Sequence, residues 1–125
     1  MTDIVRVPGN VPTRCWGSAF RDVAWVLGMS DDFSLPFREQ AERAFQALDR
    51  GLAAVGTDRS RLLNVQVYLH DVNEKGVFDE MWARWIGGDP AGWPMRSCVQ
   101  VTFAGGNKIE LIAVAARAQQ QVLQM

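Results

Sequence analysis

The stretch LPFREQAERAFQALDRGLAAV, residues 35–55, followed by LLNVQVYL, residues 62–69, decides the fold. Apolar residues of the first segment recur at steps of three and four, which builds one stripe along a helix. The members of that stripe are Phe37, Ala41, Phe45, Leu48, Leu52 and Val55. The second segment alternates as a buried strand does, with Leu63, Val65, Val67 and Leu69 on one face. A long amphipathic helix followed by a buried strand predicts an α+β protein.

Capping residues set the expected limits of this helix and of a second one. Ser34 is the expected N-cap of the first helix and Gly56 its stop. A second helix begins near Asn73, as its cap, and ends at 87–88. Its apolar stripe consists of Phe78, Met81, Trp82 and Trp85.

Short strands are expected on either side of the helices. Three precede the first helix; they span Ile4–Val7, Trp16–Phe20 and Val23–Leu27, with a tight turn near Arg21-Asp22 joining the last two. Two follow the second helix, Val99–Phe103 and Ile109–Ala115, and the Gly-Gly pair at 105–106 predicts that they form a hairpin. The predicted element order is therefore β-β-β-α-β-α-β-β.

Both helices are expected on one face of a mixed sheet. The other face also needs cover if it carries Tyr68, Cys98 and Ile112 or Leu111. The sequence offers no third layer, so a partner subunit is the simplest cover. The chain is interpreted as a single domain, residues 1–125, whose tail, 117–125, is mobile or lies on a neighbouring subunit.

Composition excludes several classes of function. The 125 residues are 48% hydrophobic and 22% charged, with a net charge of −1 and scattered basic residues, so we expect neither a nucleic-acid surface nor a membrane span. Two cysteines suit a reducing cytoplasm. A single histidine and the lack of ligand spacing speak against a zinc site, and no cofactor is predicted.

The run Pro94-Met95-Arg96-Ser97-Cys98-Val99 is the most informative for function. It places a permanently charged guanidinium at the entrance to an apolar strand, where it needs an anionic partner. A substrate carboxylate suits it, because arginine binds carboxylates through two parallel hydrogen bonds. A salt bridge between subunits and an exposed strand-entry charge are the alternatives.

This run, together with VQVYLHDVN at 65–73 and KIELIAV at 108–114, resembles the RidA/YjgF (Rid) family, whose members are also called L-PSP endoribonucleases. The resemblance covers nearly everything from Trp16 to Ala115. It implies a chorismate-mutase-like fold and a homotrimer with clefts between subunits. It also implies hydrolysis of enamine or imine acids, such as 2-aminoacrylate, to 2-keto acids and ammonia.

The resemblance also implies roles for individual residues. Arg96 matches the arginine that binds the substrate carboxylate, and Glu110 matches a glutamate that positions water. Backbone groups around Gly28 and Cys98 would complete the pocket. Trp16 stands where better-known members carry a tyrosine near the first strand pair, and Leu27 replaces an expected hydroxyl residue.

Alternatives stay open at each of these positions. Glu110 can be an exposed strand residue, and Cys98 a small buried hydrophobe rather than a nucleophile. Trp93, beside the anchor, can form an apolar wall of the pocket or belong to the core. In a two-residue hairpin Glu110 would face Val101 and not Arg96, so a bulge or a cleft shared by two subunits is needed. The rival functions are a non-catalytic keto-acid binding module and, less favoured by the charge, an endoribonuclease or translation inhibitor.

Overall fold

The computed structural model describes residues 3–118 and contains a six-stranded mixed sheet in the order β1-β2-β3-β6-β4-β5. The strands are β1 (Ile4–Pro8), β2 (Cys15–Phe20), β3 (Val23–Met29), β4 (Leu62–Leu69), β5 (Met95–Gln100) and β6 (Ile109–Ala116). The helices are α1 (Phe37–Ala54) and α2 (Lys75–Ile86), with short 3-10 turns η1 (Arg59–Arg61), η2 (Val72–Glu74) and η3 (Pro90–Gly92). This order along the chain confirms the predicted β-β-β-α-β-α-β-β pattern.

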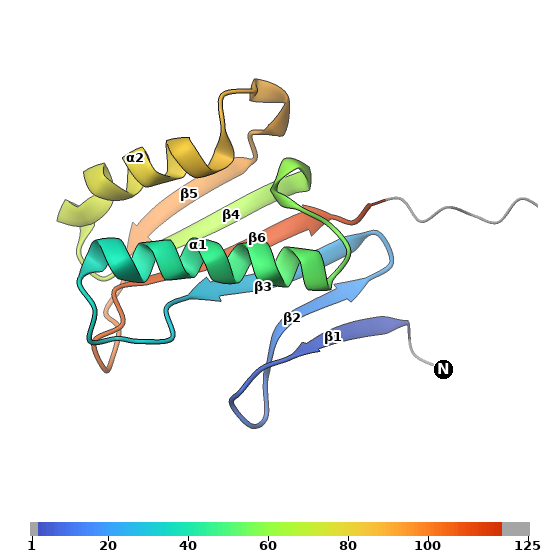
Figure 1. The fold of residues 1–125 in the computed structure, drawn as a ribbon, viewed down its shortest axis with the longest axis horizontal. Coiled ribbons are helices and arrows are strands. Elements are labelled where there is room, and N and C mark those ends of the chain that lie inside the picture. The colour runs from blue at the N-terminus through green and yellow to red at the C-terminus, as the bar shows by residue number, and fades with distance from the viewer. Residues whose placement is uncertain (1–2, 119–125) are drawn as a thin grey trace, which may run out of the picture.

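Both helices lie on the same face of the sheet, as Figure 1 shows, with α1 across the middle strands and α2 beside β5. The core lies between the two layers. The stripe predicted for α1 is buried along its whole length, from Phe37 to Val55. It packs on alternating residues of the central strands, among them Val26, Val67 and Leu111, which are at most 2% exposed. The result is a two-layer α+β fold in which no helix of residues 3–118 covers the other face of the sheet, called the helix-free face below.

The start of α1 differs from the expectation. Pro36 is its N-cap residue and offers no side-chain hydrogen bond. The hydroxyl of Ser34 instead donates to Asp32 Oδ1 at 2.6 Å, so the predicted Ser34 cap is wrong. The stop at Gly56 is confirmed, since Gly56 adopts a φ of +83°, which favours glycine. The second helix is preceded by η2, where Asp71 and not Asn73 is the capping residue.

The predicted hairpin between the last two strands is wrong. β5 pairs in parallel with β4, and β6 pairs antiparallel with both β3 and β4. β4 therefore lies between the two strands that the Gly-Gly pair was expected to join. Gly105 and Gly106 do adopt positive φ, but the loop that contains them crosses the end of β4, so β6 runs antiparallel to β5 without pairing with it. β5 also begins at Met95, earlier than the predicted Val99.

The faces of β4 differ from the expectation at its start. Leu62 is buried and Leu63 is 51% exposed, because the pairing with β6 shifts register between Leu62 and Asn64. Among the residues expected on the free face, Tyr68 and Ile112 lie there, whereas Leu111 is buried beneath the helices and Cys98 packs against the core. The predicted tail includes residues 119–125, which lie outside the described residues.

Candidate functional site

Arg96 lies on the helix-covered face of β5, the edge strand of the sheet. It is in register with Val65 of β4, whose side chain is buried under the helices. Its guanidinium stands over two rings of α2, with Cζ 5.4 Å from the Phe78 centroid and 5.2 Å from that of Trp82. Only 20% of the side chain is exposed. The cation–π contacts stabilise the guanidinium charge, but because the side chain is largely buried the charge also needs an anionic partner.

Asp79 of α2 supplies that anion within the same chain. Arg96 Nη2 donates to Asp79 Oδ1 at 2.8 Å, and Lys75 Nζ donates to Asp79 Oδ2 at 2.7 Å. Burial opposes ionisation of Asp79, but the hydrogen bonds from Lys75 and Arg96 outweigh it and lower the pKa of the carboxyl. The Arg96–Asp79 contact uses one guanidinium nitrogen. Within residues 3–118, the remaining N–H groups of the guanidinium make no other hydrogen bond or ion pair.

Cys98 follows Arg96 on the same face of β5. Its side chain is partly buried and packs against the core cluster, and burial raises the pKa of its thiol. A raised pKa keeps the sulfur protonated, which suits a packing residue better than a nucleophile. Trp93, by contrast, is 55% exposed on the loop before β5, and its Nε1 donates to the Gly87 carbonyl at 2.8 Å.

Glu110 lies on the opposite, helix-free face, at the end of the sheet. It pairs with Met29 of β3 and Tyr68 of β4. Its carboxylate lines a hollow of about 340 Å³, together with Arg14, Trp16 and Leu27. Burial raises the pKa of Glu110, and the nearby charge of Arg14 acts in the lowering direction. Burial of this carboxyl therefore favours its protonated form more than in an exposed glutamate.

Arg96 and Glu110 thus lie on opposite faces of one sheet, separated by β4. The register makes this plain, because Leu111 and Cys98 both pair with Val67 on the helix side, and Glu110 precedes Leu111. Successive residues of a strand point to opposite faces. The chain by itself does not bring the two predicted catalytic residues together.

Of the remaining predicted residues, Trp16 lies near Glu110 and Gly28 lies against the helix layer. Trp16 lies in the Glu110 hollow, where Gly9 approaches it so closely that a Cβ would come within 2.5 Å of the indole Nε1. Gly28 faces α1, since a Cβ there would lie 2.6 Å from the Ala44 carbonyl oxygen. Gly28 therefore permits close packing of α1 on β3, while its neighbour Leu27 lines the hollow.

Sequence reasoning missed Asp79 and Arg14. The spacing of Lys75 and Asp79 by four residues on a helix was an available signal for an ion pair, but nothing local connected it to Arg96. Arg14 gave no signal, because its position beside Glu110 depends on how β1 and β2 fold against β3 and β6.

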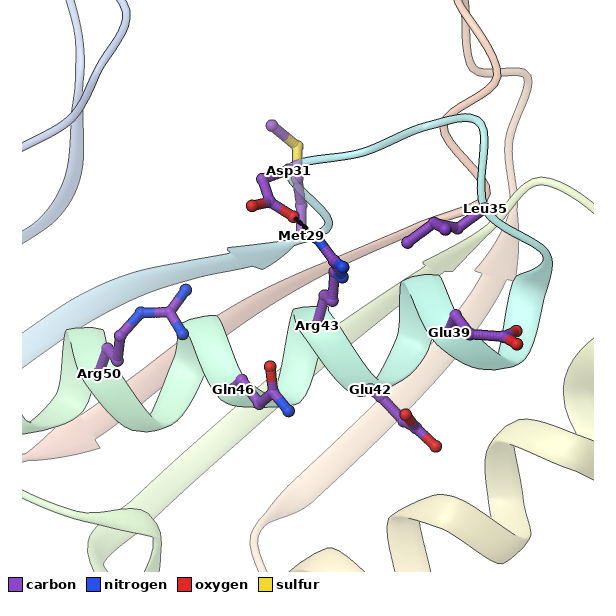
Figure 2. A pocket seen from close by; sticks show the side chains of 8 residues that line it. All are labelled: Met29, Asp31, Leu35, Glu39, Glu42, Arg43, Gln46 and Arg50. Carbon is purple, nitrogen blue, oxygen red and sulfur yellow. Dashed lines mark hydrogen bonds and ion pairs between the residues drawn. The ribbon is translucent and has the colours of Figure 1, made fainter.

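A separate hollow of about 340 Å³ lies between α1 and the loop that follows β3, as Figure 2 shows. Asp31 and Arg43 form an ion pair of 2.7 Å across it, and both side chains are largely exposed. An exposed pair of this kind contributes little free energy. This hollow contains none of the residues predicted for the site.

Within residues 3–118, no cluster of three or more His, Cys, Asp or Glu side chains is placed to bind a metal. None of the helices there is long and apolar enough to cross a membrane.

The architecture matches that of YjgF proteins with the chorismate-mutase-like fold. NMB1025 of Neisseria meningitidis, a member of the YjgF protein family, superposes with a TM-score of 0.84 at 22% identity, over 94% of this chain and 98% of that one. Escherichia coli TdcF with bound serine superposes with a TM-score of 0.78 at 22% identity, over 90% of this chain and 94% of that one.

Comparison of the sequence with family models and with known proteins identifies the family. The Endoribonuclease L-PSP family model matches residues 24–117, so the chain belongs to this family, the RidA/YjgF family. A RutC family protein of Haemophilus ducreyi is 27% identical over 99 residues, which are 78% of this chain and 83% of that protein. A protein of E. coli K12 named "Putative reactive intermediate deaminase TdcF" is 22% identical over 120 residues, which are 90% of this chain and 93% of that protein.

Proposed function

We propose that this protein hydrolyses 2-imino acids and their enamine tautomers to 2-keto acids and ammonia, as a cytoplasmic homotrimer. The observation that carries the proposal is the half-buried Glu110 carboxyl, with its raised pKa, in an open hollow. Membership of the RidA/YjgF family and the deaminase name carried by the TdcF relative support it.

The reaction needs few groups. The oxygen of water bonds to the imine carbon, the imine nitrogen is protonated, and the C–N bond breaks as the carbonyl forms and ammonia leaves. Glu110 would accept a proton from water and return it to nitrogen, for which general acid–base catalysis contributes about a hundredfold to ten-thousandfold. Arg96 would hold the carboxylate next to the imine carbon and so fix its orientation.

Because the two residues lie on opposite faces, the proposed site combines two copies of the chain. Arg96 lies on edge strand β5, where a neighbouring copy can approach it. The helix-free face also exposes apolar side chains, with Trp25 43% and Val99 43% exposed, which a second copy would cover. An assembly in which the β5 edge of one copy lies against the helix-free face of another would bring Arg96 of the first copy to the hollow of the second.

The test measures ammonia and keto-acid release from 2-iminobutanoate or 2-iminopropanoate, generated in situ by an amino-acid oxidase. We expect Arg96→Ala and Glu110→Gln each to lose about a hundredfold or more of the acceleration. Arg38→Ala, a charge loss on the exposed side of α1, is the matched control and should keep the wild-type rate. If folded wild-type protein does not exceed the buffer rate, the deaminase proposal falls.

Mixing the two inactive variants tests the shared site. In a co-expressed assembly of Arg96→Ala and Glu110→Gln chains, about a quarter of the clefts would hold both native residues, so activity should partly return. Failure to recover activity in mixed trimers would contradict the two-copy site.

A keto-acid binding module is the second candidate. Leu27, which lines the hollow without a polar group, and the pairing of Arg96 with Asp79 are the observations that favour it. Arg96-dependent binding of a keto acid by a trimer that accelerates no imine hydrolysis would support this function in place of the first.

A further inference from the structure

The Glu110 hollow contains a second charged group that the proposed reaction does not use. Among the residues that line it, the charged ones are Arg14 and Glu110, with opposite signs. Arg14 influences Glu110 through its charge, yet the two form no ion pair. Within the described part of the chain, the Arg14 guanidinium makes no hydrogen bond or ring contact either. Among residues 3–118, Arg14 is therefore a cation beside a hollow with no hydrogen bond to its donors.

The backbone holds Arg14 at the rim of this hollow. Thr13, directly before it, has a φ of +77°, an unfavourable conformation for a β-branched residue. Cys15, directly after it, is already paired with Pro8 across an irregularity in the β1–β2 ladder. Such strain persists only where surrounding structure determines it, and it is often found at functional sites. β1 and β2, which flank this loop, therefore fix the position of Arg14 at the rim of the hollow.

The space between Arg14 and Glu110 suits a short carbon chain. Leu27, Phe33 and the ring of Trp16 give the hollow apolar lining, and its size lies within the range of small-molecule sites. A substrate side chain that ended in a methyl group would leave Arg14 without a partner. A side chain that ended in a carboxylate would receive two hydrogen bonds from the guanidinium fork.

We propose that Arg14 binds a second carboxylate and makes 2-imino dicarboxylic acids the preferred substrates of this protein; the inference rests on the proposed deaminase function. The carboxylate beside the imine carbon binds Arg96 of a second copy, and the side-chain carboxylate binds Arg14. Water adds to the imine carbon, the C–N bond breaks, and ammonia and a 2-keto dicarboxylic acid leave. The positive charge of Arg14 offsets the repulsion that Glu110 would otherwise exert on the second carboxylate.

The experiment compares 2-iminosuccinate, generated by aspartate oxidase, with 2-iminopropanoate, generated by an amino-acid oxidase from alanine. The variants are Arg14→Met, which keeps an unbranched apolar side chain, and Arg14→Lys, which keeps the charge. Arg38→Met on α1 is the matched charge control. Binding of oxaloacetate and of pyruvate, followed by calorimetry, gives a readout that does not need turnover.

We expect Arg14→Met to lower kcat/KM about tenfold to a hundredfold for 2-iminosuccinate and less than about threefold for 2-iminopropanoate. Arg14→Lys should fall between, because an ammonium cannot bind a carboxylate through a planar fork. Oxaloacetate affinity should fall in parallel, with pyruvate affinity unchanged, and Arg38→Met should match wild type throughout.

Equal losses on both imines, or oxaloacetate binding that does not depend on Arg14, would overturn the dicarboxylate inference while leaving the deaminase function in place. If neither imine is hydrolysed faster than in buffer but oxaloacetate binding still requires Arg14, the deaminase function fails and the second carboxylate site stands.

Discussion

Arg96 and Arg14 are both arginines of candidate binding regions, but they stand in opposite circumstances. Arg96 lies under α2, one-fifth exposed, over two aromatic rings and bonded to Asp79. Arg14 lies at the rim of the helix-free hollow and forms no ion pair among residues 3–118. A ligand must displace Asp79 from the first, whereas among residues 3–118 no carboxylate is bonded to the second. Arg96, the arginine with the stronger sequence signal, is therefore the one whose charge is already paired within the fold.

Phe78→Ala should produce the largest effect, because it removes the ring beneath Arg96. Phe78 is fully buried and stacks on Phe45 with centroids 5.6 Å apart. We expect a loss of about 3–5 kcal/mol in the free energy of unfolding, from lost burial and an unfilled cavity. Urea unfolding measures it. Phe20→Ala, at a ring 41% exposed, should cost far less, and equal losses at both positions would contradict this account of the Arg96 side.

Gly28→Ala tests how closely α1 packs on β3, the strand that also lines the hollow. The new Cβ would lie 2.6 Å from both the Ala44 carbonyl oxygen and Leu48 Cγ, so α1 must move away from β3. We expect a loss of about 1–3 kcal/mol in the free energy of unfolding. The control is Gly76→Ala in α2, where nothing lies within 4 Å of the new Cβ and stability should rise by about 0.5–1 kcal/mol. A harmless Gly28→Ala would show that α1 packs less tightly than described.

Asp79→Asn weakens the in-chain competitor of Arg96. Keto-acid binding to Arg96 should become tighter, by up to about fivefold, since ion pairs that solvent reaches contribute at most about 1 kcal/mol. Asp49→Asn is the matched control, because Arg59 pairs with Asp49 at 2.8 Å and also stands over a tryptophan ring. Calorimetric titration should show tighter binding for Asp79→Asn alone. Unchanged binding in both variants would show that Arg96 does not bind the keto acid.

The effect of Asp79→Asn on the free energy of unfolding depends on pH in a defined direction. The pKa of Asp79 in the folded protein is lowered from its ordinary value of 3.8, so its ion pairs stabilise the fold above that pH. Their contribution is lost as the pH falls below 3.8 through the folded pKa. The stability difference between wild type and Asp79→Asn should therefore be present at pH 7 and shrink below pH 3.8. A difference that grew on acidification would contradict the pairing.

Glu110→Gln should give the smallest change in stability, with the opposite pH dependence. Burial raises the pKa of Glu110 above its ordinary 4.5, so the folded state favours the protonated form. Stability from this preference is full below pH 4.5 and lost as the pH rises through the folded pKa. Glu110→Gln should therefore equal wild type in acid and be slightly more stable at neutral pH. Thermal unfolding across this range measures the crossover.

The sequence predicted those parts of the fold that depend on local periodicity. The buried stripe of α1, its stop at Gly56 and the position of β6, expected at Ile109–Ala115 and found at Ile109–Ala116, follow from spacing and residue type. The β5–β6 hairpin was wrong because a Gly-Gly turn specifies a local change of direction and not which strand lies alongside. Leu63 was placed on the wrong face because the register shift that exposes it arises in the pairing with β6.

The candidate site was predictable residue by residue but not as an arrangement. Arg96 and Glu110 could be selected from their motifs, whereas their separation by β4 follows only from the strand order. Asp79 lies 17 residues before Arg96 in the chain, and Arg14 lies 96 residues before Glu110 (110 − 14), whereas spacing rules reach only about one helical turn.

The strand order has a consequence for synthesis of the chain. The last strand, β6, lies at the centre of the sheet between β3 and β4. Until residues 109–116 leave the ribosome, the nascent chain holds two separate fragments, β1–β3 and β4–β5, each with an unpaired edge. Such edges associate readily with other chains. We therefore expect the sheet to close only after β6 has been synthesised, and chains that stop before β6 to aggregate rather than fold in part.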